Sequence, residues 1–353
     1  MNIFDDVEEY IESRPPYEKD RHWASSVVTC PRKAWYDFHG IEKTEKPTIA
    51  RELKFRIGSA TEAEWIKLVD KMAKHKNPFG SCFDSQTMSY RPDTLLIDRI
   101  ENFCPQMIED MVTATNEGRW DKNSITDYTA WGIPFRMKVD GLSLEIGGRL
   151  DLVCTVDHAL PMLAEVKTSH MSRTNLLIKE RIIPYDYLTQ IIVYMIRYPG
   201  LIHEIHYIDR QTGYPYRYGV SEIGNKIIAQ PGGYGNDGFD AGELFDGMHP
   251  RSYIPVRLEW MEQLYETETP PGQIVVQEVD APKDKRKKFY VVSMAPFDHP
   301  SWLSREDYHM LAYEDGELIT RKKTANKVSY SSGFCPYCDY RGYCLEEALD
   351  ISS

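Results

Sequence analysis

A run of short strands followed by a helix and another strand is the feature that most limits how this chain can fold. Turn residues separate four segments of strand composition, at residues 133–139, 143–146, 149–156 and 162–167. A helical pattern follows over 185–198, ends at Pro199-Gly200, and gives way to a further strand over 201–208. Strands joined through a crossover helix predict an α/β fold with a mixed central β-sheet flanked by helices.

Weaker patterns surround this region. Apolar residues at helical spacing predict a helix over about 50–74, which Asn77-Pro78 ends. Further elements are expected as helices near 32–36, 102–115 and 304–313 and as a strand over 289–294. Residues 211–250 are rich in Gly, Tyr and Asp, and we expect them to form an excursion or loop.

The charge balance limits the partners of the chain. A net charge of −12, from 42 basic and 54 acidic residues, argues against a general nucleic-acid coat, because phosphate binding needs clustered Lys and Arg. It still permits an acidic site whose carboxylates bind a metal ion. No apolar run approaches the roughly 20 residues that span a bilayer, and Met1–Asp6 lacks the features of a signal peptide. We therefore expect a cytoplasmic protein with no membrane partner.

Two carboxylates and a lysine lie on two adjacent predicted strands. A hairpin centred near Ala159 would put Asp151 roughly opposite Lys167, with Glu165 on the diagonal and all three side chains on one face. Carboxylates in this arrangement can hold Mg²⁺ or Mn²⁺, and a lysine beside the ion can orient an attacking water. Taken alone, the same residues also fit an ordinary surface hairpin with a Glu–Lys pair.

Polar residues on the two neighbouring helices can complete this site. Glu62 on the early helix offers another carboxylate, and Gly58 one turn earlier permits close backbone approach. Gln190 and Tyr194 on the later helix are four residues apart and so share one face. Each of these residues, by itself, is also typical of the solvated side of an amphipathic helix.

Together and in this order, these pieces resemble the PD-(D/E)XK nuclease superfamily, and within it the RecB-like branch. The resemblance covers roughly residues 50–200 and rests on Gly58-x-x-x-Glu62, Gly148-x-x-Asp151, Glu165-x-Lys167 and Gln190-x-x-x-Tyr194. It implies a restriction-endonuclease-like core in which Lys167 is the catalytic lysine and the metal ligands are Asp151 and Glu165, with Glu62 and Val166. Gln190 and Tyr194 would help to position nucleic acid. Many relatives carry His where Glu62 stands, which leaves its role and the number of bound metal ions open.

Three of the seven cysteines are closely spaced near the C-terminus. An odd number in a cytosolic protein argues against a disulfide framework and favours metal ligation. Cys335, Cys338 and Cys344 can converge on one centre, with Cys30 as the best candidate for a fourth ligand, and such a set fits structural zinc or an iron–sulfur cluster. The arrangement is similar to that of iron–sulfur RecB-like nucleases, among them the AddB subunit and CRISPR-associated exonucleases. This similarity implies a 4Fe–4S cluster that joins the N- and C-terminal segments.

The resemblance divides the chain into four expected parts. They are an N-terminal cluster-associated segment (1–49), a nuclease core (50–210, with an insertion at about 76–130), an accessory region with late core elements (211–318) and a C-terminal cysteine segment (319–353).

The activity implied is that of a metal-dependent DNA exonuclease acting on ends or single strands, in recombination or repair, alone or with a partner protein. The alternative is an inactive or partner-dependent relative that binds DNA or serves CRISPR adaptation, with zinc in place of iron–sulfur. The sequence contains no Gly-x-x-x-x-Gly-Lys-Ser/Thr loop, so nothing in it supports a fused helicase. Arg32, Trp35 and Tyr36 are the first candidates for contacts with unpaired bases.

Overall fold

The chain folds into two compact units. The computed structural model describes residues 20–45, 48–76, 82–84, 89–91, 96–155, 160–169, 183, 185–232, 238–242, 248–272, 274–280, 288–294, 309–314, 317–318, 332–333 and 338–352. The larger unit comprises Asp20–Val28 and Leu53–Leu258, and the smaller unit comprises the other described residues. None of the helices in the described ranges has both the length and the apolar character needed to cross a membrane.

The strand β5 (Glu145–Cys154) organises the eight-stranded sheet of the larger unit. The strand β4 (Thr129–Met137) pairs with it in antiparallel fashion along one edge. On the other edge, β1 (Arg21–Trp23) pairs parallel with the first residues of β5, and β6 (Met162–Ser169) pairs antiparallel with its last residues. Between β1 and β6, no described strand pairs with residues 148–151 on that edge.

The sheet continues from β6 through four strands, which are β7 (Ile202–Asp209), β8 (Pro215–Ile223), β9 (Lys226–Pro231) and β10 (Phe239–Asp240). The crossover helix α7 (Tyr185–Arg197) connects the parallel pair β6–β7, and the pairs from β7 to β10 are antiparallel. The predicted excursion over 211–250 is therefore wrong where β8, β9 and β10 extend the central sheet. Its glycines serve tight turns, because Gly213 and Gly224 adopt positive φ before and after β8.

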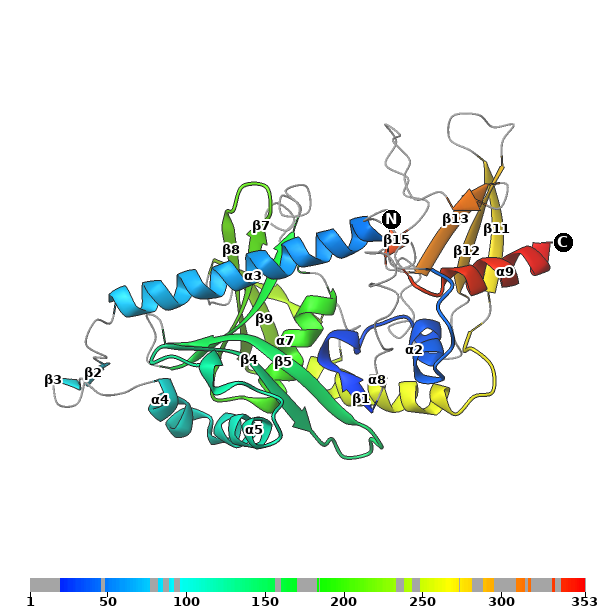
Figure 1. Ribbon diagram of the computed structural model, residues 1–353. Helices are drawn as coiled ribbons and strands as arrows, with labels where there is room; N and C mark the ends of the chain where they lie inside the picture. Colours follow the sequence, from blue (N-terminus) through cyan, green and yellow to red (C-terminus); the bar gives the residue numbers. More distant parts are fainter. Residues whose placement is uncertain are drawn as a thin grey trace. The chain divides into compact units, whose positions relative to one another are not determined.

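The helices α3 (Ile49–Lys76) and α7 lie on opposite faces of this sheet (Figure 1). Successive side chains of β7 point to opposite faces. His206 accepts a hydrogen bond of 3.1 Å from Trp65 of α3, whereas the ring of Tyr207 lies 5.9 Å from that of Tyr187 of α7. An apolar core lies between α3 and the sheet and includes Trp65, Ile66, Val69, Leu152, Cys154, Ala164, Val166 and Ile208. A mixed sheet between helices confirms the predicted fold class.

The two strands predicted at 143–146 and 149–156 form the single strand β5. Gly147 and Gly148 lie inside the strand and do not end it. A side chain at either position would collide with the neighbouring strands. A Cβ at Gly148 would lie 2.3 Å from the ring of Phe135 in β4, and one at Gly147 would lie 2.5 Å from the Arg21 side chain in β1. The glycines therefore serve close strand packing.

Short elements complete the larger unit. The helix predicted over 102–115 is two helices, α4 (Leu96–Phe103) and α5 (Pro105–Asn116), because Pro105 starts a new helix after Cys104. The strands β2 (Cys82–Asp84) and β3 (Ser89–Arg91) form a separate hairpin, and short 3₁₀ turns occur at Ala24–Ser26 and Lys122–Ser124. The helix α8 (Pro250–Tyr265) was not predicted, contains Pro255, and belongs to the larger unit as far as Leu258.

Gly200, in the turn after α7, lies against the end of α4. A Cβ at this position would lie 1.9 Å from the main-chain oxygen of Phe103. Because backbone must move to admit even a methyl group, we expect Gly200→Ala to lower the free energy of unfolding by about 3 kcal/mol. Gly242→Ala, whose Cβ would meet a movable Asp240 oxygen at 3.2 Å, is the control and should cost less than about 0.5 kcal/mol. Denaturant unfolding measures both, and equal losses would contradict the prediction.

The smaller unit contains a five-stranded sheet and helices from both ends of the chain. The helices α2 (Pro31–Phe38) and α9 (Arg341–Ser352) accompany the strands β11 (Ile274–Asp280), β12 (Lys288–Met294), β13 (His309–Glu314), β14 (Glu317–Leu318) and β15 (Ser332–Gly333). The strand predicted over 289–294 is confirmed as β12. The helix predicted over 304–313 is wrong for 309–313, which pair with β12 and β15 as part of β13, and 304–308 lie outside the described residues. A short apolar run does not distinguish strand from helix by period.

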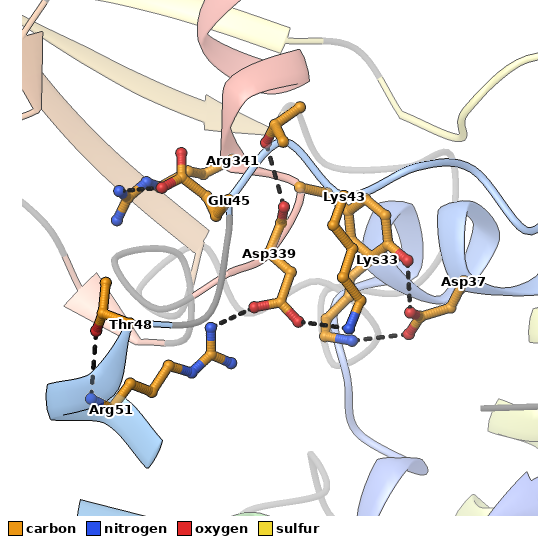
Figure 2. A network of polar contacts seen from close by, with 10 residues as sticks. Lys33, Asp37, Lys43, Glu45, Thr48, Arg51, Asp339 and Arg341 are labelled. Atoms are coloured by element: carbon orange, nitrogen blue, oxygen red, sulfur yellow. Dashed lines mark hydrogen bonds and ion pairs between the residues drawn. The ribbon is translucent and has the colours of Figure 1, made fainter. Parts of the chain in front are cut away.

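Polar contacts and stacked rings join the two chain ends within the smaller unit. Figure 2 shows the carboxylate of Asp339 between Arg51 and Lys43, with the lysine nitrogen 3.2 Å away. The main-chain oxygen of Asp339 also accepts the N–H of Glu45 at 3.0 Å. Tyr340 stacks on Tyr36 of α2, with ring centroids 5.2 Å apart. The N- and C-terminal segments therefore meet through contacts that require no cofactor.

The residues expected to contact unpaired bases are buried in this packing. Trp35 and Tyr36 are 6% and 5% exposed, and Arg32 is 2% exposed. Arg32 instead pairs with Glu347 of α9 and donates to the main-chain oxygen of Gly272 at 3.1 Å. The prediction of base contacts is wrong for these residues, because their rings and guanidinium hold the smaller unit together.

Candidate active site

Asp151 and Glu165 meet where β5 and β6 separate. The ladder between these strands ends with Leu152 opposite Ala164. Extending that register by one residue places Asp151 opposite Glu165, and not opposite Lys167 as the predicted hairpin had it. The midpoint of the observed register is residue 158 and not 159, and this difference moves every pairing by two residues. Opposite residues of antiparallel strands share a face, so the two carboxylates still lie on one side of the sheet.

The Asp151 carboxylate bridges the gap between the separating strands. Its Oδ2 accepts the main-chain N–H of Val166 at 2.8 Å. After Ala164, β6 no longer pairs with β5, but it continues to pair with β7 in parallel register. The Val166 side chain is fully buried in the core beneath α3, so any contact of Val166 with a metal ion would have to use its main chain.

Glu165 is fully buried, and Lys167 forms an ion pair with one of its oxygens. The other oxygen, Oε2, accepts no hydrogen bond from any described residue, although the Tyr194 hydroxyl and Asp151 lie near Glu165. A buried carboxylate oxygen without a donor costs free energy, and a bound cation would remove that cost. The donor set therefore fits a metal ion.

Burial and the charge of Asp151 raise the pKa values of the other carboxylates at this site. Burial, followed by the charge of Asp151, raises the pKa of Glu165 to about 8. Burial also raises the pKa of Asp151 and of Glu62, and the charge of Asp151 raises the pKa of Glu62 further. Burial alone would lower the pKa of Lys167, but Glu165 and Asp151 together raise it by more. Three carboxylates around one ammonium group form an electrostatic setting that attracts a divalent cation.

Close packing of α3 on the end of β6 brings Glu62 to this site. A Cβ at Gly58 would lie 3.1 Å from the Thr168 hydroxyl oxygen, so the absence of a side chain lets the helix approach the strand. Glu62 lies one turn further along and is close enough to Asp151 and Lys167 for their charges to change its pKa.

The helix α7 packs on the face of the sheet to which Glu165 and Lys167 point. Gln190 donates to the Tyr194 hydroxyl at 2.6 Å, and that hydroxyl donates to the main-chain oxygen of Arg149 at 3.2 Å. Tyr194 has no exposed surface and Gln190 is 8% exposed. Any effect of this pair on nucleic acid would therefore act through the neighbouring carboxylates. Tyr187, three residues before Gln190 on the same helix, lies 5.3 Å from the Lys167 ammonium and was missed, although its spacing to Gln190 could have revealed it.

The larger unit thus brings together the predicted site residues, which are Glu62, Asp151, Glu165, Val166, Lys167, Gln190 and Tyr194. Within the described part of the chain, no group of three or more His, Cys, Asp or Glu side chains is placed so that it could hold a metal ion. Mg²⁺ commonly binds through one or two carboxylates and completes its shell with waters and substrate phosphates. Asp151 and Glu165 can supply the two carboxylates of such a site.

Three of the predicted cluster ligands lie close together in the smaller unit. Burial raises the pKa of Cys338 to about 11 and that of Cys344 to about 12, and the charge of Cys30 raises both further. The Arg32 guanidinium has the opposite effect on Cys344. Cys335 lies outside the described residues. These three thiols interact, but together they form no group among the described residues that could hold a metal ion.

Ionisation of Glu165 should make the metal-free protein less stable as pH rises. Its pKa rises from an ordinary value of 4.5 to about 8 in the folded protein. The stability that its protonated form contributes is complete below about pH 4.5 and is lost as pH rises through about 8. We expect the thermal midpoint in EDTA to fall over this interval, and to fall less in Glu165→Gln, which cannot ionise. A wild-type midpoint that rises relative to the variant between pH 5 and 8 would contradict this.

No protein-family model matches the chain, and no curated protein matches it by sequence. Among solved structures, the chain is similar to SSO0001, at 12% identity over 75% of this chain and 86% of that one, with a TM-score of 0.29. It is also similar to an alkaline exonuclease, LHK-Exo from Laribacter hongkongensis, at 12% identity over 73% of this chain and 94% of that one, with a TM-score of 0.26.

Proposed function

We propose that this protein is a metal-dependent nuclease in which Asp151 and Glu165 hold a Mg²⁺ or Mn²⁺ ion and Lys167 assists phosphodiester hydrolysis. The observation that carries the proposal is the crowding of three carboxylates around one lysine where β5 and β6 separate. A structural ion pair needs one carboxylate for each lysine. The additional buried charge is explained if a cation and a phosphate group bind there.

The residues around the site have separable roles in this proposal. The bound ion would lower the pKa of a water molecule and offset the charge that develops on the phosphate. Lys167, now paired with Glu165, can turn to a phosphate oxygen or to the attacking water. The Val166 N–H holds the Asp151 carboxylate in place, and the Tyr194 hydroxyl lies near Glu165. Glu62 is suited to orient water or to bind a second ion.

The order of the motifs supports a finer assignment. We place the chain in the RecB-like branch of the PD-(D/E)XK nucleases and propose that it acts as an exonuclease on DNA ends or single strands. The relevant residues occur on a helix, two strands and a second helix in the order that the branch requires, from Glu62 through Asp151, Glu165 and Lys167 to Gln190 and Tyr194. Work in recombination or repair, alone or with a partner protein, follows from the same assignment.

The cysteines support a second metal centre. We propose that Cys30, Cys335, Cys338 and Cys344 hold a structural 4Fe–4S cluster, with zinc as the alternative occupant. The support is the mutual proximity of three of these thiols within the unit that contains both chain ends. The cluster would add a link between the N- and C-terminal segments and would take no part in hydrolysis, which requires no electron transfer.

Cleavage of end-labelled and circular DNA, each single- and double-stranded, tests the proposed activity. Incubation with Mg²⁺, Mn²⁺ or EDTA should give products only when a divalent ion is present. An exonuclease leaves the circles intact. Cleavage of the circles would replace exonuclease by endonuclease, and failure to cut any substrate with either ion would overturn the proposed function.

A further inference from the structure

Phe55 of α3 is 70% exposed, the highest value among the large hydrophobic side chains that the structure describes. It does not lie on the outward side of the helix. Phe55 and Glu62 are seven residues apart, which places them about 20° apart around the helix axis and roughly 10 Å apart along it. Gly58, between them, faces Thr168 at the end of β6. The exposed ring therefore lies on the face of α3 that directs Glu62 to the candidate active site.

The same face of α3 is covered further along the helix. Val69 is 3% exposed and Ala73 is fully buried, and both continue the stripe that begins with Phe55 and Glu62. An aromatic residue on the core-facing stripe is expected to be buried. Its exposure beside an active site marks a surface that a bound molecule can cover.

Three basic residues lie near Phe55, in the helix or in the adjoining turn. Lys54 and Arg56 flank Phe55 in the helix, and Arg210, in the turn after β7, donates to the main-chain oxygen of Lys54 at 3.4 Å. All three side chains are exposed. Glu52 is the acidic residue of this turn, so Lys54, Arg56 and Arg210 still leave an excess of positive charge near Phe55 in a chain of net charge −12.

This combination selects one class of ligand. Cations bind phosphates, and an exposed ring stacks on a base only when that base is unpaired. A duplex hides its base faces, and an apolar protein partner has no need of the cations. Single-stranded nucleic acid meets both conditions.

We infer that Phe55 stacks on an unpaired base of single-stranded nucleic acid while Lys54, Arg56 and Arg210 bind its phosphates, two helical turns before Glu62. The inference rests on the proposed nuclease function, because this contact leads the strand toward the carboxylates. Phe55 is thus a substrate-binding residue and takes no part in the chemical step.

Binding of a fluorescein-labelled oligothymidylate to the full-length protein in EDTA tests this role without cleavage. Phe55→Ala should weaken binding about 10-fold, within a range of about 5- to 100-fold, and Phe55→Tyr should restore it. Leu53→Ala is the matched control, because Leu53 is 54% exposed on the same helix but about 160° away around its axis. Its affinity and thermal midpoint should equal those of the wild type.

Salt dependence separates stacking from phosphate contacts. Lys54→Gln and Arg56→Gln should each reduce the slope of log K against log salt by about 0.7, whereas Phe55→Ala should leave the slope unchanged. Binding of a blunt duplex of the same length should be insensitive to Phe55→Ala.

Five outcomes would overturn the inference. Equal oligothymidylate affinity of Phe55→Ala and wild type would do so, as would an equal loss in Leu53→Ala. A lower thermal midpoint in Phe55→Ala alone would mean that the chain itself covers the ring. If the wild type binds no oligothymidylate and cuts none of the DNA substrates with Mg²⁺ or Mn²⁺, the proposed function fails as well. If the wild type cleaves and the KM of Phe55→Ala is unchanged, only the role of Phe55 is refuted.

Discussion

Lys167→Ala is expected to lower the rate of DNA cleavage by about 10²- to 10⁴-fold while the protein remains folded. The ammonium group pairs with Glu165 and its charge also acts on Asp151, and alanine removes both this charge and the hydrogen bond to Glu165. Asp151→Asn and Glu165→Gln should cause losses at least as large. These two variants nearly preserve side-chain shape but remove the charges that we propose bind the metal ion.

Matched variants on α3 separate this effect from a general loss of charge. Lys67 and Glu64 form an exposed pair on the same helix as Glu62, with 2.7 Å between charged atoms. Lys67→Ala and Glu64→Gln should therefore cleave like the wild type, whereas Glu62→Gln should be slower. Initial rates at saturating Mg²⁺, with circular dichroism to establish folding, measure these differences. Wild-type cleavage by Lys167→Ala, Asp151→Asn or Glu165→Gln would refute the proposed active site.

The composition of the site could be predicted from the sequence, but its register could not. The two-residue period of a strand places Glu165 and Lys167 on one face, and a short connection brings Asp151 to the same face. The partner of Asp151 depends on the centre of the turn, which residue composition does not fix. Because an error of one residue moves the pairing by two, the side chains stayed on the predicted face while Asp151 faced Glu165 instead of Lys167.

Tertiary packing explains the other differences. The burial of Glu165 depends on α7 and Tyr194, which local sequence patterns do not position. The strand β8 lies in a segment whose Gly and Tyr content is typical of loops, yet Tyr218 is fully buried and its ring lies 5.9 Å from that of Tyr207. Periodicity assigns Phe55 to the buried stripe of α3, and only the structure shows that its ring is exposed.

Cys338→Ser and Cys344→Ser are each expected to remove the visible absorption of anaerobically purified protein. Iron should fall from about four atoms per chain to near zero, because loss of one thiolate opens the Cys₄ set that a 4Fe–4S cluster requires. The thermal midpoint should fall as well, since metal binding contributes to folding free energy when the ligands come from distant parts of the chain. Cys30 and Cys344 satisfy that condition, because they lie near opposite ends of the sequence.

Cys104→Ser is the control for loss of a buried thiol. Cys104 lies in the larger unit, and burial raises its pKa to about 11 without any neighbouring thiol. This variant should keep its colour and iron content. A colourless wild type with one zinc ion per chain would refute the iron–sulfur assignment and leave the nuclease proposal intact.

The cluster variants should lose stability without unfolding the smaller unit completely. Arg51 and Lys43 hold Asp339, and Tyr340 stacks on Tyr36, so the chain ends remain joined when the cysteines are altered. Cleavage rates per folded molecule should therefore stay near the wild-type value, because the proposed catalytic residues lie in the larger unit and hydrolysis needs no electron transfer. Loss of cleavage in a folded Cys338→Ser protein would show that the cysteine centre contributes directly to activity.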